Sequence, residues 1–83
     1  MFDKWSMGGI NWRIITDVIM DFLYGFHAYG GCTTAELQNY VNGVLSTSFT
    51  YNQLYHLLSY HYKNGHLPIF KYQSANHIFW NLQ

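Results

Sequence analysis

The chain has 83 residues, enough for one small domain. Charged residues make up 10% of it, apolar residues 49% and aromatic residues 20%, whereas a typical soluble domain is about 25% charged. Its single cysteine excludes an internal disulfide, and no apolar run approaches the roughly 20 residues of a membrane span. The first residues also lack the apolar segment of a signal peptide. We therefore expect a soluble cytoplasmic protein, in its own cell or in a host, whose charge-poor surface is partly covered by a partner.

The charges are distributed unevenly. All four acids precede residue 37: Asp3, Asp17, Asp21 and Glu36. The rest of the chain holds two lysines, Lys63 and Lys71, and four of the five histidines. This half is mildly cationic, and more so below about pH 6.5, where ordinary histidines protonate. Such a pattern is a faint electrostatic footprint for a polyanion, weaker than the basic stripe of a strong nucleic-acid binder.

Residues 1–9 are predicted to form a flexible N-terminal arm before a domain at residues 10–83. Gly8-Gly9 supplies a flexible joint. The arm also carries Phe2 and Trp5. Two interpretations stay open: a disordered terminus, or an arm whose aromatic rings dock on this chain or on a second copy of it.

A first helix is predicted from Asn11 to about His27. Asn11 suits the N-cap position, and the glycines of "YGG" at 29–31 end the helix. Apolar residues recur at spacings of three and four, as on one face of a helix. They are Ile15, Val18, Ile19, Phe22, Leu23 and Phe26.

A second helix follows "CTTAE". Thr33 and Glu36 have the spacing of a capping box, in which each side chain bonds the other residue's backbone N–H. Asn42-Gly43 is expected to stop this helix early. Its inward side is predicted to consist of Leu37, Tyr40, Val41 and Val44.

The stretch "TYNQLYHLLSYHYKNGH", residues 50–66, predicts a third helix. Thr50 and Gln53 repeat the capping-box spacing, and Asn64-Gly65 forms the stop. Three leucines and a histidine make the inward stripe: Leu54, Leu57, Leu58 and His61. Tyr55 and Tyr62 flank that stripe.

Two short runs after the third helix predict a β-hairpin. "HLPIFKY" and "HIFWNL" are rich in β-branched and aromatic residues, and "QSAN" separates them. In the second run Ile78, Trp80 and Leu82 alternate with their neighbours, which is strand periodicity. Pro68 is expected at the start or edge of its strand. The fold class is therefore α+β.

This order of elements resembles the winged helix-turn-helix superfamily over about residues 11–82. "GGCTTAELQNYV" looks like the loop and second helix of that fold, where Cys32-Thr33 would add a short strand to the wing sheet. "TYNQLYHLLSYHYKNGHL" looks like its third helix and "LPIFKYQSANHIFWNL" like its wing. The resemblance implies a winged helix, with three helices followed by a two-stranded β-hairpin wing. In its general character the sequence is similar to small winged-helix regulators of bacteria, phages and archaeal viruses. The size of the chain also suits a viral or plasmid origin.

What the resemblance implies about function is binding to double-stranded DNA, with the third helix in the major groove and the wing on the backbone. On the helix it assigns DNA contacts to Tyr51, Asn52, Gln53, His56, Ser59, Tyr60 and Lys63. On the wing it assigns them to Lys71, Gln73, Ser74, Asn76 and His77. Asn and Gln can pair bidentately with adenine, and the hydroxyls and imidazoles can bond phosphates or base edges.

This sequence departs from the usual pattern in charge. Only Lys63 and Lys71 lie on the candidate face, while Lys4 and Arg13 lie at the other end of the chain. Since phosphate neutralisation by cations supplies most non-specific affinity, a monomer would bind weakly. We therefore expect a homodimer, a transcriptional regulator that spans two half-sites. The residues expected at its seam, or against another partner, are Phe2, Trp5 and Trp12.

A second hypothesis keeps the fold and changes the partner. A winged-helix module can bind a protein, as an inhibitor or adaptor of a host or replication protein, without binding DNA. The low charge and the many tyrosines favour this alternative, because Tyr and Trp are favoured anchors of protein interfaces. The acid-free C-terminal half favours DNA.

Several residues also have purely structural interpretations. Gln53 is better explained as the capping partner of Thr50, whereas Asn52 fits either role. His61 is expected to be a hydrogen-bonded core histidine, and Cys32 a small buried residue.

No pattern indicates an active site, a metal or a cofactor. No two histidines have the spacing that would place two ligands on one helical face. The one alternative is a site at the base of the wing made by His61, His66, His77 and Cys32. The four carboxylates are scattered, and no phosphate-binding glycine loop or nucleophile motif is present. The sequence therefore predicts a protein that is not an enzyme.

Overall fold

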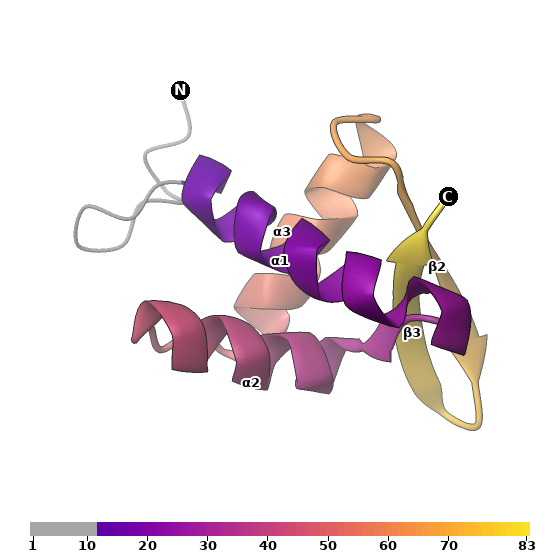
Figure 1. The fold of residues 1–83 in the computed structure, drawn as a ribbon, viewed down its shortest axis with the longest axis horizontal. Coiled ribbons are helices and arrows are strands. Elements are labelled where there is room, and N and C mark those ends of the chain that lie inside the picture. The colour runs from indigo at the N-terminus through magenta and orange to yellow at the C-terminus, as the bar shows by residue number, and fades with distance from the viewer. Residues whose placement is uncertain (1–11) are drawn as a thin grey trace.

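The computed structural model describes residues 12–83 as an α+β domain, so the α+β class is confirmed. Its elements in chain order are α1 (Trp12–Phe26), a 3-10 turn η2 (His27–Tyr29), β1 (Cys32–Thr33), α2 (Thr34–Leu45), α3 (Tyr51–Lys63), β2 (Ile69–Ser74) and β3 (His77–Leu82). Figure 1 shows the helices crossing one another, with the strands at one side of the helical layer. The predicted arm at 1–9 and the predicted N-cap Asn11 lie outside the described residues.

The described strands form one antiparallel sheet in the order β1-β3-β2. The predicted hairpin is confirmed, with Ile69 opposite Leu82 and Ser74 opposite His77. The sheet has three strands, however, and not the two named in the expected fold class, because Cys32 pairs with Trp80. The added strand is the short one that the resemblance implied.

The hairpin turn is shorter than the predicted "QSAN". Gln73 and Ser74 still pair across the sheet, so only Ala75 and Asn76 make the turn. Both have positive φ, 49° and 68°, as a two-residue turn that matches the twist of its strands requires.

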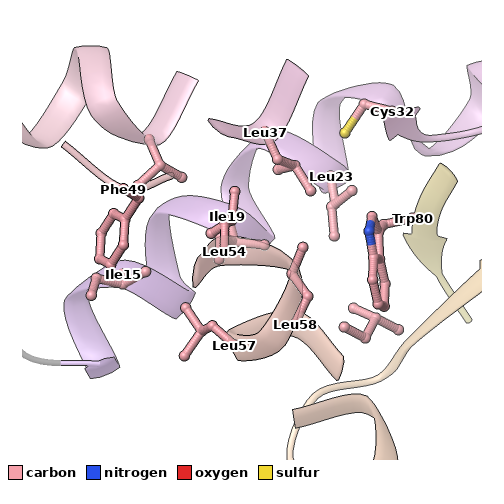
Figure 2. Close-up of a cluster of buried hydrophobic side chains, with 12 residues drawn as sticks. Ile15, Ile19, Leu23, Cys32, Leu37, Phe49, Leu54, Leu57, Leu58 and Trp80 are labelled. Atoms are coloured by element: carbon pink, nitrogen blue, oxygen red, sulfur yellow. The ribbon is translucent and has the colours of Figure 1, made fainter. Parts of the chain in front are cut away.

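The core lies where the three helices meet the sheet. Figure 2 shows Ile15, Ile19 and Leu23 of α1 pointing toward side chains of the other helices and toward Trp80 of β3. The predicted inward leucines of α3 are fully buried. At 0% exposure, Trp80 donates its indole N–H to Thr34 Oγ1 over 2.8 Å. This bond satisfies a polar group whose burial would otherwise be costly.

Helix α1 matches its predicted range closely, with one difference at its C-terminal end. Phe26, expected on the buried stripe, is 42% exposed; its ring is tilted against that of Phe22 and packs edgewise on Tyr29. The buried part of the stripe therefore ends at Leu23, one turn earlier than the spacing predicts.

Both predicted capping boxes are present. Thr33 N–H donates to Glu36 Oε1 over 2.8 Å, and Glu36 N–H donates back to Thr33 Oγ1 over 3.1 Å. Thr50 N–H donates to Gln53 Oε1 over 3.0 Å, and Gln53 N–H donates to Thr50 Oγ1 over 3.1 Å. The structural role expected of Gln53 is thus confirmed. These bonds fix the first residues of α2 and α3.

The predicted stop of the second helix at Asn42-Gly43 is wrong. Helix α2 continues to Leu45 and ends at Ser46, which has a left-handed φ of 54°. The Asn42 side chain forms hydrogen bonds with the following loop. Its Oδ1 accepts from Thr47 Oγ1 and from the Phe49 N–H, and its Nδ2 donates to the Phe49 carbonyl. An Asn-Gly pair therefore need not end a helix when the asparagine has tertiary partners.

The longer α2 also changes its inward face. Val44, predicted to face inward, is 52% exposed, whereas Leu45 packs against the core. The reason is the helical period, since Leu45 follows the buried Val41 by four residues and so shares its face.

Gly31 allows β1 to approach the sheet closely. Its φ is +85°, and a Cβ at this position would collide with the Trp80 carbonyl oxygen. A glycine is therefore required on both grounds.

In the described part of the chain no helix is both long and apolar enough to cross a membrane.

Candidate nucleic-acid interface

The exposed side of α3 carries most of the side chains expected to contact DNA. Tyr51, Asn52 and Gln53 in its first turn, His56 in the next and Lys63 in its last turn are all exposed. The Gln53 side chain can form four hydrogen bonds. One is used by the Thr50 N–H, which donates to Oε1, so at most three remain for a ligand. The helix therefore presents a mainly uncharged row of donors and acceptors.

Two of the predicted α3 contacts are only partly accessible. Ser59 and Tyr60 are half-buried, and the Ser59 Oγ is shielded from solvent. The Tyr60 ring packs edgewise on the rings of His61 and His66. Both residues thus belong more to the packing of α3 than to its exposed row.

The residues expected on the hairpin are exposed. Lys71, Gln73 and Ser74 lie on β2, Asn76 in the turn and His77 at the start of β3. They extend the exposed row of α3 onto a second element.

A contact between Lys71 and Tyr55 joins the hairpin to α3. Lys71 Nζ donates to the Tyr55 hydroxyl over 2.7 Å and lies 5.0 Å from the centre of the Tyr55 ring and 5.9 Å from that of Trp80. The hydrogen bond from Lys71 lowers the pKa of Tyr55, because the ammonium stabilises the phenolate. The cation is thereby held over two aromatic faces, a favourable arrangement.

A hollow of about 320 Å³ opens beside this contact. Tyr55 of α3 lines one side, and Lys71, Tyr72, Gln73 and Ile78 of the hairpin line the rest. It offers one ammonium, phenol hydroxyls and an amide next to aromatic rings, so it suits an anionic group attached to a flat or apolar one.

Sequence reasoning missed Tyr55 and Tyr72 as members of this surface. The sequence places Tyr55 at the flank of the inward stripe, yet Tyr55 follows the exposed Tyr51 by one helical turn, and the two rings are parallel within 7° at a centre-to-centre distance of 6.4 Å. That spacing was a usable signal. Tyr72 gave no such signal, because its hydroxyl reaches across the fold to donate to the Gly30 carbonyl.

The fold also changes the expected place of Arg13. Trp12 stacks on His61 of α3, with ring centres 5.3 Å apart, so the exposed Arg13 lies near the last turns of α3, despite its distance in sequence. Trp12, expected at a dimer seam, is half-buried against its own chain. Phe2 and Trp5, the other expected seam residues, lie outside the described residues.

The histidines and the cysteine do not assemble into one site. His61, expected to be a core histidine, is 1% exposed, and its Nδ1 lies 3.3 Å from Nδ1 of His66. Desolvation, and then the neighbouring His66, lower the pKa of His61. Cys32 is buried, as expected, and burial raises its pKa to about 12. Over residues 12–83, no three His, Cys, Asp or Glu side chains gather where they could hold a metal ion.

Comparison of the chain with protein-family models, curated proteins and solved structures gives no match.

Proposed function

We propose that this protein is a small winged-helix DNA-binding protein that acts as a dimeric transcriptional regulator. The observation that carries the proposal is the contact of Lys71 with Tyr55, which joins the exposed residues of α3 to those of the hairpin. These residues display amide, hydroxyl, imidazole and ammonium groups, and the chain has no acid after Glu36 to repel phosphates.

The order of the elements supports the winged-helix assignment. A short strand precedes α2, and the hairpin follows α3 directly and pairs with that strand through β3. Helix α3 would lie in the major groove and the hairpin would touch the backbone. Asn52, exposed in the first turn of α3, is the residue best placed to pair with an adenine edge.

The number of cations on this surface sets the expected affinity for DNA and the number of protein copies that bind it. Lys63 and Lys71 are the cations on this surface, and log affinity falls with log salt by about 0.9 per neutralised phosphate. A monomer that uses both lysines should give a slope of about −1.8, and a dimer about −3.6. We therefore propose a homodimer, and sedimentation of the protein alone and with DNA tests it.

The test of DNA binding is a fluorescence-anisotropy titration against random duplex DNA over a series of salt concentrations, followed by site selection. Asn52→Ala should weaken the selected site more than random DNA, whereas Lys63→Ala should weaken both alike. Asn39→Ala, the same change on an exposed asparagine of α2, should alter neither affinity. Equal losses for both duplexes in Asn52→Ala would refute the readout role of Asn52.

The exposed aromatic rings favour the second candidate function, a protein-binding module that acts as an inhibitor or adaptor. Tyr24 is 79% exposed and Tyr29 is 82% exposed, and rings of this kind anchor protein interfaces. Absence of DNA binding at low salt, even at high protein concentration, would favour this function. A pull-down with the wild type and with Tyr29→Ala would then identify the partner.

A further inference from the structure

The C-terminal end of α3 brings two imidazoles together. Gly65 has a φ of +68°, its N–H donates to the Tyr62 carbonyl, and the His66 N–H donates to the His61 carbonyl over 2.9 Å. These two bonds and the left-handed glycine make the helix-ending motif that usually places one apolar side chain against another. Here the two side chains are His61 and His66.

The spacing of the two rings suits a shared ion. Their Nδ1 atoms are 3.3 Å apart and share a long hydrogen bond. An ion bound by both nitrogens would take the place of the shared proton, which the donor ring would then carry on Nε2. Two nitrogen ligands of a tetrahedral Zn²⁺, each about 2.0–2.1 Å from the metal, lie about 3.3–3.4 Å from one another.

The rings are also held in place before any ion arrives. Trp12 stacks on His61, and the Tyr60 ring packs edgewise on both histidines, with centres 5.3 and 5.5 Å away. His61 Nε2 is buried and has no hydrogen-bond partner among the described residues, so Nδ1 is the nitrogen that His61 can offer. His66 is exposed and leaves the pair open to solvent on its own side.

The electrostatics favour a cation at this position. The C-terminal end of a helix carries a partial negative charge from its aligned peptide dipoles. Neutral imidazole is a preferred ligand of Zn²⁺, Cu²⁺ and Ni²⁺.

We propose that His61 and His66 bind one divalent transition-metal ion of the Zn²⁺ type through their Nδ1 atoms, with water in the remaining positions. The ion would tie the loop after α3 to the helix, just before β2 begins. The site lies apart from the hollow at Lys71 and does not depend on DNA binding.

The test is calorimetric titration of the whole chain with ZnCl₂ at pH 7.5, in a buffer that does not chelate, paired with thermal unfolding. Zn²⁺ should bind at one ion per chain and raise the Tm, because an ion that binds only the folded state stabilises it. His66→Ala changes an exposed residue, so it should fold, which circular dichroism checks. It should weaken Zn²⁺ binding by at least about tenfold and abolish the rise in Tm.

His56→Ala is the matched control, since His56 is an exposed histidine on the same helix, away from the pair. It should bind Zn²⁺ like the wild type. The proposal is overturned if Zn²⁺ up to about 1 mM does not bind the wild type, or if His66→Ala and His56→Ala lose affinity equally.

Discussion

Replacing Asn42 by alanine should destabilise the fold strongly, although Asn42 lies near the surface end of α2. Its side chain makes three hydrogen bonds: to Thr47 Oγ1 over 2.7 Å, to Phe49 N–H over 2.9 Å and to the Phe49 carbonyl over 3.0 Å. The carbonyl keeps a second donor, Gln38 Nε2. In the variant the Phe49 N–H loses its acceptor, Asn42 Oδ1, and Phe49 is only 4% exposed. The loop that leads into α3 would thus lose its main anchor.

The size of the effect follows from these bonds. The lost bonds to Thr47 Oγ1 and to the Phe49 carbonyl count about 0.5–1.5 kcal/mol each, and the buried Phe49 N–H left unpaired costs about 1–3 kcal/mol, which gives about 2–6 kcal/mol in all. For a domain of this size that lowers the Tm by roughly 8 °C or more. Asn39→Ala is the matched control, because it makes the same change at an exposed position of the same helix and so gains the same helix propensity.

Urea unfolding of both variants, followed by circular dichroism, measures the difference. If the two free energies of unfolding agree within about 0.5 kcal/mol, Asn42 does not hold the loop and the reasoning fails.

Two glycines should respond oppositely to alanine. Gly31→Ala should lower the Tm sharply or prevent folding, because φ is positive at this position and a Cβ would collide with the Trp80 carbonyl. Gly43→Ala should stabilise the fold by about 0.5–1 kcal/mol, because Gly43 lies inside α2 with open space around it. Thermal unfolding that ranks the two variants the other way would contradict the structure. Cys32 should resist thiol reagents at pH 8, because a pKa raised from 9.0 to about 12 lowers its thiolate fraction about a thousandfold. The raised pKa also predicts that the fold loses stability as the pH rises above about 9 toward 12, since the unfolded chain releases the thiol proton first. Native labelling as fast as labelling in denaturant, or a Cys32→Ala variant with an unchanged alkaline profile, would show that the thiol is accessible.

The local part of the fold was predictable from the sequence. The starts of α2 and α3 were each marked by a residue pair three apart, as at Thr50 and Gln53, and that signal depends only on neighbouring backbone groups. The inward stripe of α3 and the alternation of β3 were predictable for the same reason, because burial follows the helical and strand periods.

The error at Asn42-Gly43, and the features that the sequence did not reveal, arose where a side chain has a distant partner. Asn42-Gly43 looks like a helix stop until the Phe49 backbone is seen to occupy the asparagine. The hollow at Lys71 depends on a contact between α3 and β2 that no local spacing encodes. The pairing of His61 with His66 depends on the left-handed conformation of Gly65, which folds the chain back over the helix end. Each case is tertiary structure overriding a local preference.

The small number of cations shapes the proposed way of reading DNA. With two lysines on the α3 and hairpin surface, the salt-dependent term is small, so a useful affinity must come from contacts that depend on base identity and on shape. Lys71 is already committed to the Tyr55 hydroxyl and two rings, so a phosphate in the hollow would meet a cation fixed in position beside a phenol. A fixed donor set loses less entropy on binding than a free lysine does. Such a surface would discriminate between sequences more strongly than its charge alone suggests, and its non-specific binding would be weak. This combination suits a regulator that must leave most of the DNA unoccupied.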